Sequence, residues 1–190
     1  MRPSTTSGVL RRIARLRKDS RAVSAIEFAL IAPTFAMIYV ATVELGSALT
    51  IYRRTAQVAA TAADLTAQVR RVSKSDIRDI QAASSSILNP YPTEPLSVVI
   101  SSVVANDSNN GKVSWSCASS GAARSEGSSF NVPTGLTEAN TSVIVAEVTY
   151  KYKGLLGLTS LFNPGSFDMK RTFYARPRRS IEVDKTDNGC

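Results

Sequence analysis

The chain has 190 residues and a formal net charge of +8, with two cysteines and no histidine. The length suits one compact domain with an extension. Without histidine the chain lacks the commonest metal ligand and the usual general base, and two thiols alone cannot form a structural zinc site. Since it also contains no phosphate-binding glycine loop, CxxC pair or serine nucleophile motif, we expect neither enzymatic activity nor a cofactor.

Basic residues are concentrated in residues 1–21, which hold seven Lys and Arg side chains against one acid. Such a run is typical of a nucleic-acid site, a membrane surface or the cytoplasmic flank of a membrane span. The uncharged stretch Phe28–Val43 follows, between Glu27 and Glu44. With its flanks it reaches the ~20 residues that cross a bilayer. We therefore predict a basic cytoplasmic segment, then a transmembrane helix over residues 22–52 that contacts the lipid bilayer, and no nucleic-acid binding.

The distribution of charge predicts the orientation of this span. Seven basic residues precede it, and Arg53 and Arg54 follow it. By the positive-inside rule the N-terminus is cytoplasmic and the rest lies across the membrane, as a helical extension, 53–89, and a β-rich domain, 90–190. The alternative is a removed secretory signal. It fits the basic start, but the apolar region exceeds the roughly 7–15 residues of a signal core.

Two apolar stripes with helical spacing follow the span. The first consists of Val58, Ala62, Leu65, Val69 and Val72, and the second of Ile77, Ile80, Ala83 and Ile87 or Leu88. Spacings of three and four place each set on one helix face. We expect the first helix to start after Asp19 or Ser20 and to run to about Arg71, and a second helix to have Ser73 or Ser75 as its N-cap. Both stripes fit packing within the protein or, alternatively, contact with a partner helix.

The prolines of NPYPTEP, residues 89–95, end the helical part, and β patterns follow. Four segments are expected as strands: Leu96–Ala105, Lys112–Cys117, Thr141–Lys153 and Phe167–Arg176. Turns or loops are expected at Asn109–Gly111, Ala118–Ser129 and in GLLGLTSLFNPG, residues 154–165. Glu147 is expected to face solvent. The fold class is therefore α+β: a long N-terminal helix that includes the span, a second helix and an antiparallel sheet of three to four strands.

Both cysteines, Cys117 and Cys190, lie beyond the span. In an oxidising compartment two thiols favour a disulfide, which would pin the C-terminus to the domain. The alternative is a pair of unpaired thiols.

Charged and proline residues within the span are unusual. A carboxylate at membrane depth is a functional hypothesis by default, because its insertion costs a few kcal/mol. Alternatively, Glu27 lies one turn into the helix at the head-group level, paired with Arg21 or Lys18. Glu44 is expected at the opposite interface by the same logic. Pro33 frees a helix carbonyl, which membrane helices tolerate.

The pattern that these residues form together with their neighbours is more specific than any one of them. Ala22, Val23, three further residues and then Glu27-Phe28 resemble the processing signature of type IV-like pilins. The stretch AVSAIEFALIAPTFAMIYVATVELGSALTIYRRTAQVAATAADLTAQ resembles the N-terminal region of the TadE/TadG-like family, over Ser20 to about Gln68. Members of this family are minor pilins or pseudopilins of the tight-adherence (Flp) pilus.

The resemblance implies a single-pass protein of the bacterial inner membrane with a pilin-like periplasmic domain and a role in pilus assembly, either in the membrane or within the pilus. It implies other pilus subunits and the inner-membrane assembly machinery as partners, and a prepilin peptidase if the chain is cut after Ala22, where the family usually has Gly. It also implies that Glu27 pairs with the terminal amine of a neighbouring subunit and that Pro33 bends or unwinds the helix during assembly. The alternative function is a membrane-anchored periplasmic scaffold or sensor that never enters a filament.

Overall fold

The structure is a computed structural model that describes residues 20–106, 110–133, 135–154, 167–187 and 189–190, and side chains from residue 23 onward. The helices are α2 (Ser20–Ala67), α3 (Lys74–Ser85) and the short 3₁₀ helix η1 (Ser86–Leu88). The strands are β1 (Arg71–Val72), β2 (Leu96–Ala105), β3 (Gly111–Ala118), β4 (Ser129–Phe130), β5 (Ser142–Tyr152), β6 (Phe167–Ala175) and β7 (Asp184–Lys185). The chain divides into two compact units, residues 1–45 and 46–190, each of which is described by itself.

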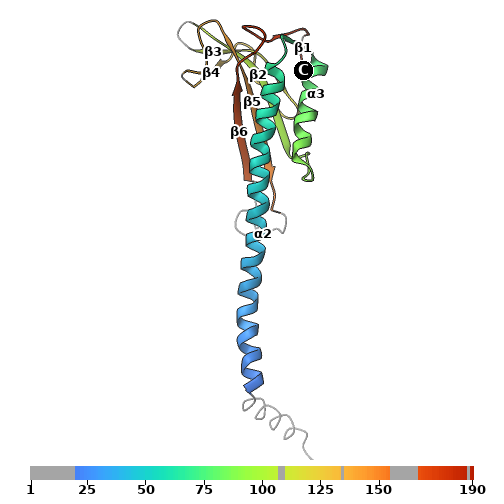
Figure 1. The fold of residues 1–190 in the computed structure, drawn as a ribbon, viewed down its shortest axis with the longest axis vertical. Coiled ribbons are helices and arrows are strands. Elements are labelled where there is room, and N and C mark those ends of the chain that lie inside the picture. Colours follow the sequence, from blue (N-terminus) through green and yellow to red (C-terminus); the bar gives the residue numbers. More distant parts are fainter. Residues whose placement is uncertain (1–19, 107–109, 134, 155–166, 188) are drawn as a thin grey trace, which may run out of the picture. The chain divides into compact units, whose positions relative to one another are not determined.

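The described part of the first unit is the N-terminal half of α2 (Figure 1). Its large apolar side chains are exposed, for example Phe28 at 72% and Leu30 at 73%. The helix is long and apolar enough to cross a membrane, and no part of its most apolar window is buried within the protein. A core helix of a soluble protein would bury such a window, so this half has the surface of a helix made for lipid.

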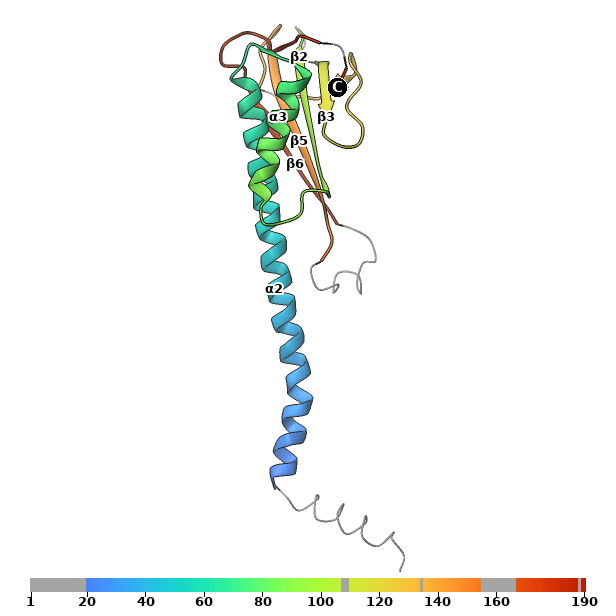
Figure 2. The same ribbon diagram turned by 90° about the vertical axis from the view of Figure 1, so that its right-hand side faces the viewer.

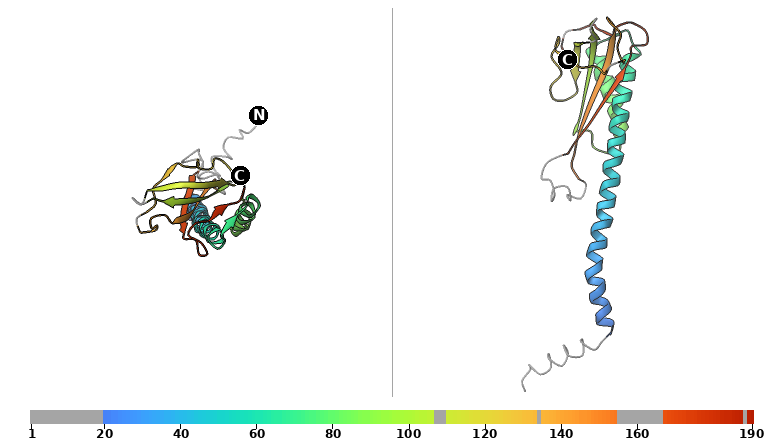
Figure 3. Two further views of the ribbon diagram at one scale, coloured as in Figure 1. Left: turned by 90° about the horizontal axis from the view of Figure 1, so that it is seen from above. Right: turned by 90° about the vertical axis from the view of Figure 1, so that its left-hand side faces the viewer.

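The second unit contains a five-stranded antiparallel sheet in the order β4-β3-β2-β5-β6. The C-terminal part of α2 and helix α3 lie side by side on one face of this sheet (Figures 2 and 3). At the centre of the sheet, Ile100 of β2 pairs with Cys117 of β3 on one side and with Ala146 of β5 on the other.

The main core fills the space between the helices and the sheet. Val58 and Ala62 of α2, Ile77 of α3, and Val98 and Ile100 of β2 are each at most 2% exposed. Each large aliphatic side chain buried in this way contributes about 1.5–3 kcal/mol to folding. Ala59, Ala62, Ala63 and Ala67 of α2 are buried in this core as well.

A smaller apolar cluster lies apart from the main core, around Val103, Val113 and Phe130. The register of β2 and β3 shifts between Ser102 and Val103, so the alternation of the side chains changes at this point. Gly111 is required there, because a Cβ atom would lie 2.6 Å from the carbonyl oxygen of Phe130.

The start of α3 is capped as the sequence predicts. The hydroxyl of Ser73 accepts a hydrogen bond from the amide of Asp76 at 3.2 Å, and the Asp76 carboxylate accepts one from the amide of Ser73 at 2.9 Å. This reciprocal pair is a capping box. Ser73, rather than Ser75, is therefore the N-cap.

The α+β class is confirmed, with two differences of detail. The sheet has one strand more than expected, because the two-residue β4 pairs with the start of β3. Helix α2 ends at Ala67, not at Arg71, so the assignment of Val69 and Val72 to its helical stripe is wrong: Val69 is 37% exposed, and Val72 is buried but lies in β1. The expectations for the basic N-terminal segment and for the β5–β6 loop fall on residues 1–19 and 155–166, outside the described residues.

The last part of the chain returns to the short segment between α2 and α3. Strand β7 pairs in parallel with β1, Arg71 opposite Asp184 and Val72 opposite Lys185. The indole Nε1 of Trp115 donates to the carbonyl of Val183 at 2.7 Å. This return was not predicted, because two-residue strands carry no periodic signal.

Candidate functional site

The residues singled out by the sequence for assembly all lie in α2, which begins at Ser20. Val23 is 52% exposed and Phe28 is 72% exposed, and Glu27 is exposed as well. Val23 and Glu27 are four residues apart, so they lie on the same helix face. Ala22 belongs to the same first turns of the helix. The structure therefore presents the acidic side chain and its apolar neighbours on an uncovered surface.

Glu27 and Glu44 mark the two ends of the apolar segment. Glu44 follows Glu27 by 17 positions, which corresponds to about 26 Å of helix at 1.5 Å per residue, close to the ~30 Å of a hydrocarbon core. Glu44 differs from Glu27 in being only 6% exposed. The spacing fits one carboxylate near each head-group region, which was the more conservative expectation for both.

Pro33 is exposed and lies inside α2, where the helix continues on both sides of it. It cannot donate the backbone hydrogen bond of an ordinary helical residue. The helix shows no interruption at this position, and the expected bending role of Pro33 in assembly stays a prediction. Another polar group in the same segment is satisfied by the helix itself, since the Thr42 hydroxyl donates to the carbonyl of Ile38 at 2.8 Å.

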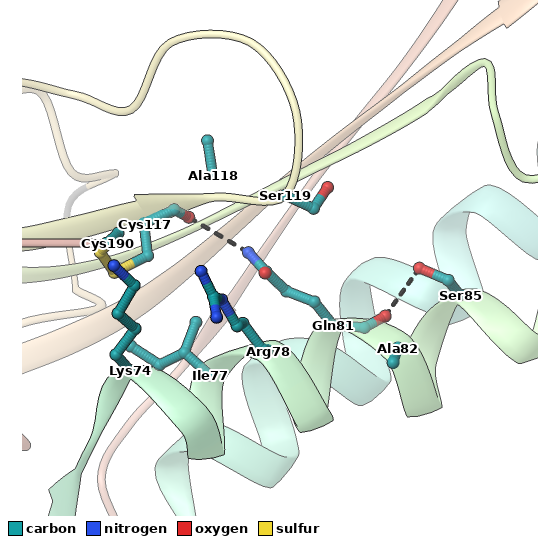
Figure 4. A pocket seen from close by; sticks show the side chains of 10 residues that line it. All are labelled: Lys74, Ile77, Arg78, Gln81, Ala82, Ser85, Cys117, Ala118, Ser119 and Cys190. Atoms are coloured by element: carbon teal, nitrogen blue, oxygen red, sulfur yellow. Dashed lines mark hydrogen bonds between the residues drawn. A yellow bond between two sulfur atoms is a disulfide. The ribbon is translucent and has the colours of Figure 1, made fainter.

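A second site lies in the second unit, where α3, the end of β3 and the C-terminal residue enclose a pocket of about 420 Å³ (Figure 4). Cys117 and Cys190 form a disulfide with their Cα atoms 5.5 Å apart. The carboxamide of Gln81, 6% exposed, donates to the carbonyls of Val98 at 3.0 Å and Cys117 at 3.4 Å. The predicted pairing of the two cysteines is thus present in the structure, and it attaches the C-terminus to the sheet.

The lining of this pocket is basic and polar. It consists of Lys74, Ile77, Arg78, Gln81, Ala82, Ser85, Cys117, Ala118, Ser119 and Cys190. None of these residues is a carboxylate or a histidine, so the pocket has no acid–base pair of those types. Among the described residues there is also no group of three or more side chains able to hold a metal ion.

The alternation of β5 predicted that Glu147 faces solvent, but its side chain makes an ion pair. Its carboxylate accepts two hydrogen bonds from the guanidinium of Arg124, at 2.5 and 2.7 Å. The carboxylate raises the pKa of Arg124 by accepting these bonds. Arg124 also lies 4.6 Å from the centre of the Phe130 ring. The pair closes the loop between β3 and β4 over the sheet, a contact that the loop's Ser/Gly/Ala composition does not reveal.

Comparison with known proteins gives a match for the helix that contains the first of these two sites. Residues 22–64 match the family model described as TadE-like protein. This range contains Glu27, Pro33 and Glu44 and lies wholly within α2, so the resemblance inferred from the sequence is confirmed for this helix. No curated protein and no solved structure matches the chain.

Proposed function

We propose that this chain is a single-pass membrane component of the tight-adherence (Flp) pilus system, acting as a pseudopilin or minor pilin with a structural role and no catalytic activity. The observation that carries the proposal is the match of residues 22–64 to the TadE-like family. The matched helix is also the only described helix with the length and composition of a membrane span. The pilus system supplies the partners: other subunits and the inner-membrane assembly machinery.

The exposed apolar surface of the first unit supports the proposed membrane location. Eleven large apolar side chains between Val23 and Leu45 are between 40% and 73% exposed. Moving each from water into hydrocarbon is favourable by about 1.5–3 kcal/mol when burial is complete. That gain far exceeds the cost of a few kcal/mol for one carboxylate near the interface.

The proposed orientation places the N-terminus in the cytoplasm and the second unit in the periplasm of the bacterial inner membrane. The basic N-terminal segment supports it through the positive-inside rule. The disulfide between Cys117 and Cys190 supports it independently, because structural disulfides persist in oxidising compartments.

Glu27 is the proposed assembly residue. When spans of neighbouring subunits leave the lipid and pack together, an unpaired carboxylate between them is costly, whereas a carboxylate paired with a cation fixes the register of the subunits. The free amine of a neighbouring chain, exposed if a prepilin peptidase cuts after Ala22, is the proposed partner.

The test is Glu27→Leu, with Ile31→Leu as a matched control on the same exposed helix. We expect both variants to insert into the membrane, and only Glu27→Leu to lose incorporation. The measurement is the amount of the chain in sheared pili relative to the membrane fraction. Normal incorporation of Glu27→Leu would exclude the pairing role. If pili form while even the unmodified chain stays in the membrane, the protein is an anchored scaffold.

A non-reducing intact mass of the chain from its native membrane completes this test. Loss of residues 1–22 would show cleavage after Ala22 and would leave Glu27 as the fifth residue of the mature chain. A full-length mass would remove the terminal amine as its partner.

A further inference from the structure

The end of the second unit that carries Gly46 has an unusual surface. Gly46 follows Leu45, the last residue of the first unit, so this is the end joined to the apolar segment. Two arginines bring other elements to the first turns of α2 in this unit. Arg54 donates to the carbonyl of Ile87 at 2.8 Å and to that of Asn89. The guanidinium of Arg171, on β6, lies 3.8 Å from the centre of the Tyr52 ring.

Strand β6 runs in the same direction as α2. Arg171 lies beside Tyr52, and further along the chain the amide of Arg178 donates to the carbonyl of Ala67 at 2.9 Å. Phe167 precedes Arg171 by four residues, which corresponds to about 13 Å of strand toward the Gly46 end. The beginning of β6 and the end of β5, which pair side by side, therefore both lie at this end (Figure 2).

Basic side chains gather here, and we name them the basic collar. The collar consists of Arg53, Arg54, Lys151, Lys153, Lys170 and Arg171. Its members come from α2, from β5 and the residue after it, and from β6. Arg53 and the three lysines are exposed. The β5–β6 register places the three lysines near one another, since Lys151 is opposite Asp168 and Thr149 is opposite Lys170.

The net charge of this unit equals the charge at the end that carries the collar. Residues 46–190 contain 16 Lys and Arg and 12 Asp and Glu. Six of these cations but, among the described residues, only two of the acids, Glu94 and Asp168, lie at this end, which gives it +4. The formal charges of the other ten cations and ten acids in the sequence of this unit cancel. A net charge confined to one end of a folded unit indicates a partner of opposite charge at that end.

Aromatic side chains accompany the cations. Phe167 is 62% exposed and Tyr52 is 36% exposed. Aromatic rings mixed with long basic side chains are typical of surfaces that lie at the level of lipid head groups. The apolar segment that adjoins this end is proposed to enter the bilayer, so the bilayer is the nearest partner for this surface.

We propose that the basic collar, with Phe167 and Tyr52, binds anionic phospholipid head groups of the membrane surface on the side of the second unit. This inference rests on the proposed single-pass topology. Anionic head groups create a negative surface potential that attracts cations within about one Debye length, ~8 Å at physiological salt. The collar would hold the folded unit against the bilayer until the subunit leaves the membrane for the pilus.

The test uses the full chain reconstituted in nanodiscs of phosphatidylcholine, with or without about 30% phosphatidylglycerol. Acetylation of each lysine is followed by mass spectrometry. We expect Lys151, Lys153 and Lys170 to react at least about threefold more slowly in the anionic nanodiscs, and this protection to vanish at 1 M salt, where the Debye length is ~3 Å. Lys112 is exposed and pairs with Val104 at the opposite end of β2, so it serves as the internal control and should not change.

A pair of variants tests whether the collar lysines act together as one surface. In Lys151→Gln/Lys153→Gln the protection of Lys170 should fall, whereas Lys112→Gln should leave it intact. Equal reactivity in both lipids would overturn the proposal. Protection that depends on protein concentration and not on lipid charge would assign the collar to a second copy of the chain, and would also overturn it.

Flotation of the same nanodiscs, or resistance of the chain to alkaline extraction from liposomes, tests the topology independently. A chain that does not remain with lipid refutes the membrane span and the collar together. A chain that remains with lipid but shows unprotected collar lysines refutes the collar alone.

Discussion

The two halves of helix α2 are built for different surroundings. From Val23 to Leu45 the helix carries large apolar side chains, and these are exposed. From Gly46 to Ala67 its inward face is made mostly of small residues, and Ala59, Ala62, Ala63 and Ala67 are at most 1% exposed. One continuous helix thus contains a surface suited to lipid and a surface suited to a β-sheet.

The difference shows how residue size distinguishes two kinds of apolar surface. Lipid chains adapt to any shape, so a span gains most from long side chains that cover its backbone. A protein core is close-packed, so a helix that lies on a sheet needs short side chains where the two backbones approach.

The strongest test of this contrast is removal of the disulfide, which should weaken only the second unit. Cys117 and Cys190 are 73 residues apart, and a bridge over a loop of that length stabilises a domain by about 2–4 kcal/mol. Urea unfolding, followed by the fluorescence of the single tryptophan, Trp115, should shift to lower urea on reduction. The variant Cys117→Ala/Cys190→Ala should unfold at the lower urea midpoint, and reductant should not change that midpoint. An unchanged midpoint would mean that the C-terminus is held by its other contacts.

A matched pair of substitutions compares the two halves directly. Ala62→Leu places a larger side chain at a 0% exposed position and should destabilise the second unit by about 1–3 kcal/mol through overpacking. Ala36→Leu makes the same change at an exposed position of the first half and should leave the midpoint unchanged. The measurement is again the unfolding midpoint reported by Trp115. Equal effects would contradict the division of α2 into two surroundings.

The smallest expected effect concerns the cap of α3 and depends on pH. Hydrogen bonds from the hydroxyl and then from the amide of Ser73 lower the pKa of Asp76. A lowered pKa in the folded state means that the carboxylate contributes stability above its unfolded pKa, about 3.9. That contribution is lost as the pH falls through the folded pKa.

Asp76→Asn should therefore melt slightly below the unmodified chain at pH 7, and the difference should shrink as the pH falls below about 4. The comparison is made by thermal melting at a series of pH values. Asp79→Asn, on an exposed position of the same helix, is the control and should show no such convergence. A pH-independent difference would show that the carboxylate charge has no part in the cap.

The elements with a repeating pattern were predictable. The four long strands lie within two residues of their predicted bounds, and the cap of α3 is one of the two serines that the sequence offered. Alternation and capping are local properties, set by neighbours a few residues apart. The sequence did not reveal β4 or the β1–β7 pair, because pairing of two-residue strands depends on where the rest of the fold brings them.

The functional residues also divide into those that the sequence reveals and those that only the fold brings together. Glu27, Pro33 and Glu44 stand out in the sequence because each contradicts the apolar character of its surroundings. The collar residues do not, because Arg53, Lys151 and Lys170 lie in three separate segments whose charges look like ordinary solvated positions. Arg124 and Glu147 were missed for the same reason, since their pairing depends on a loop that folds back over the sheet.

By itself the sequence determined the apolar helix and its charged flanks, the second helix and the alternating strands, because the balance between lipid, water and protein core acts on each residue according to its chemistry. The tertiary structure alone decided which end of the folded unit is basic, which side chains pair across the sheet and that β7 pairs with β1. Those properties depend on distances between residues that are remote along the chain, and such distances exist only once the backbone has folded.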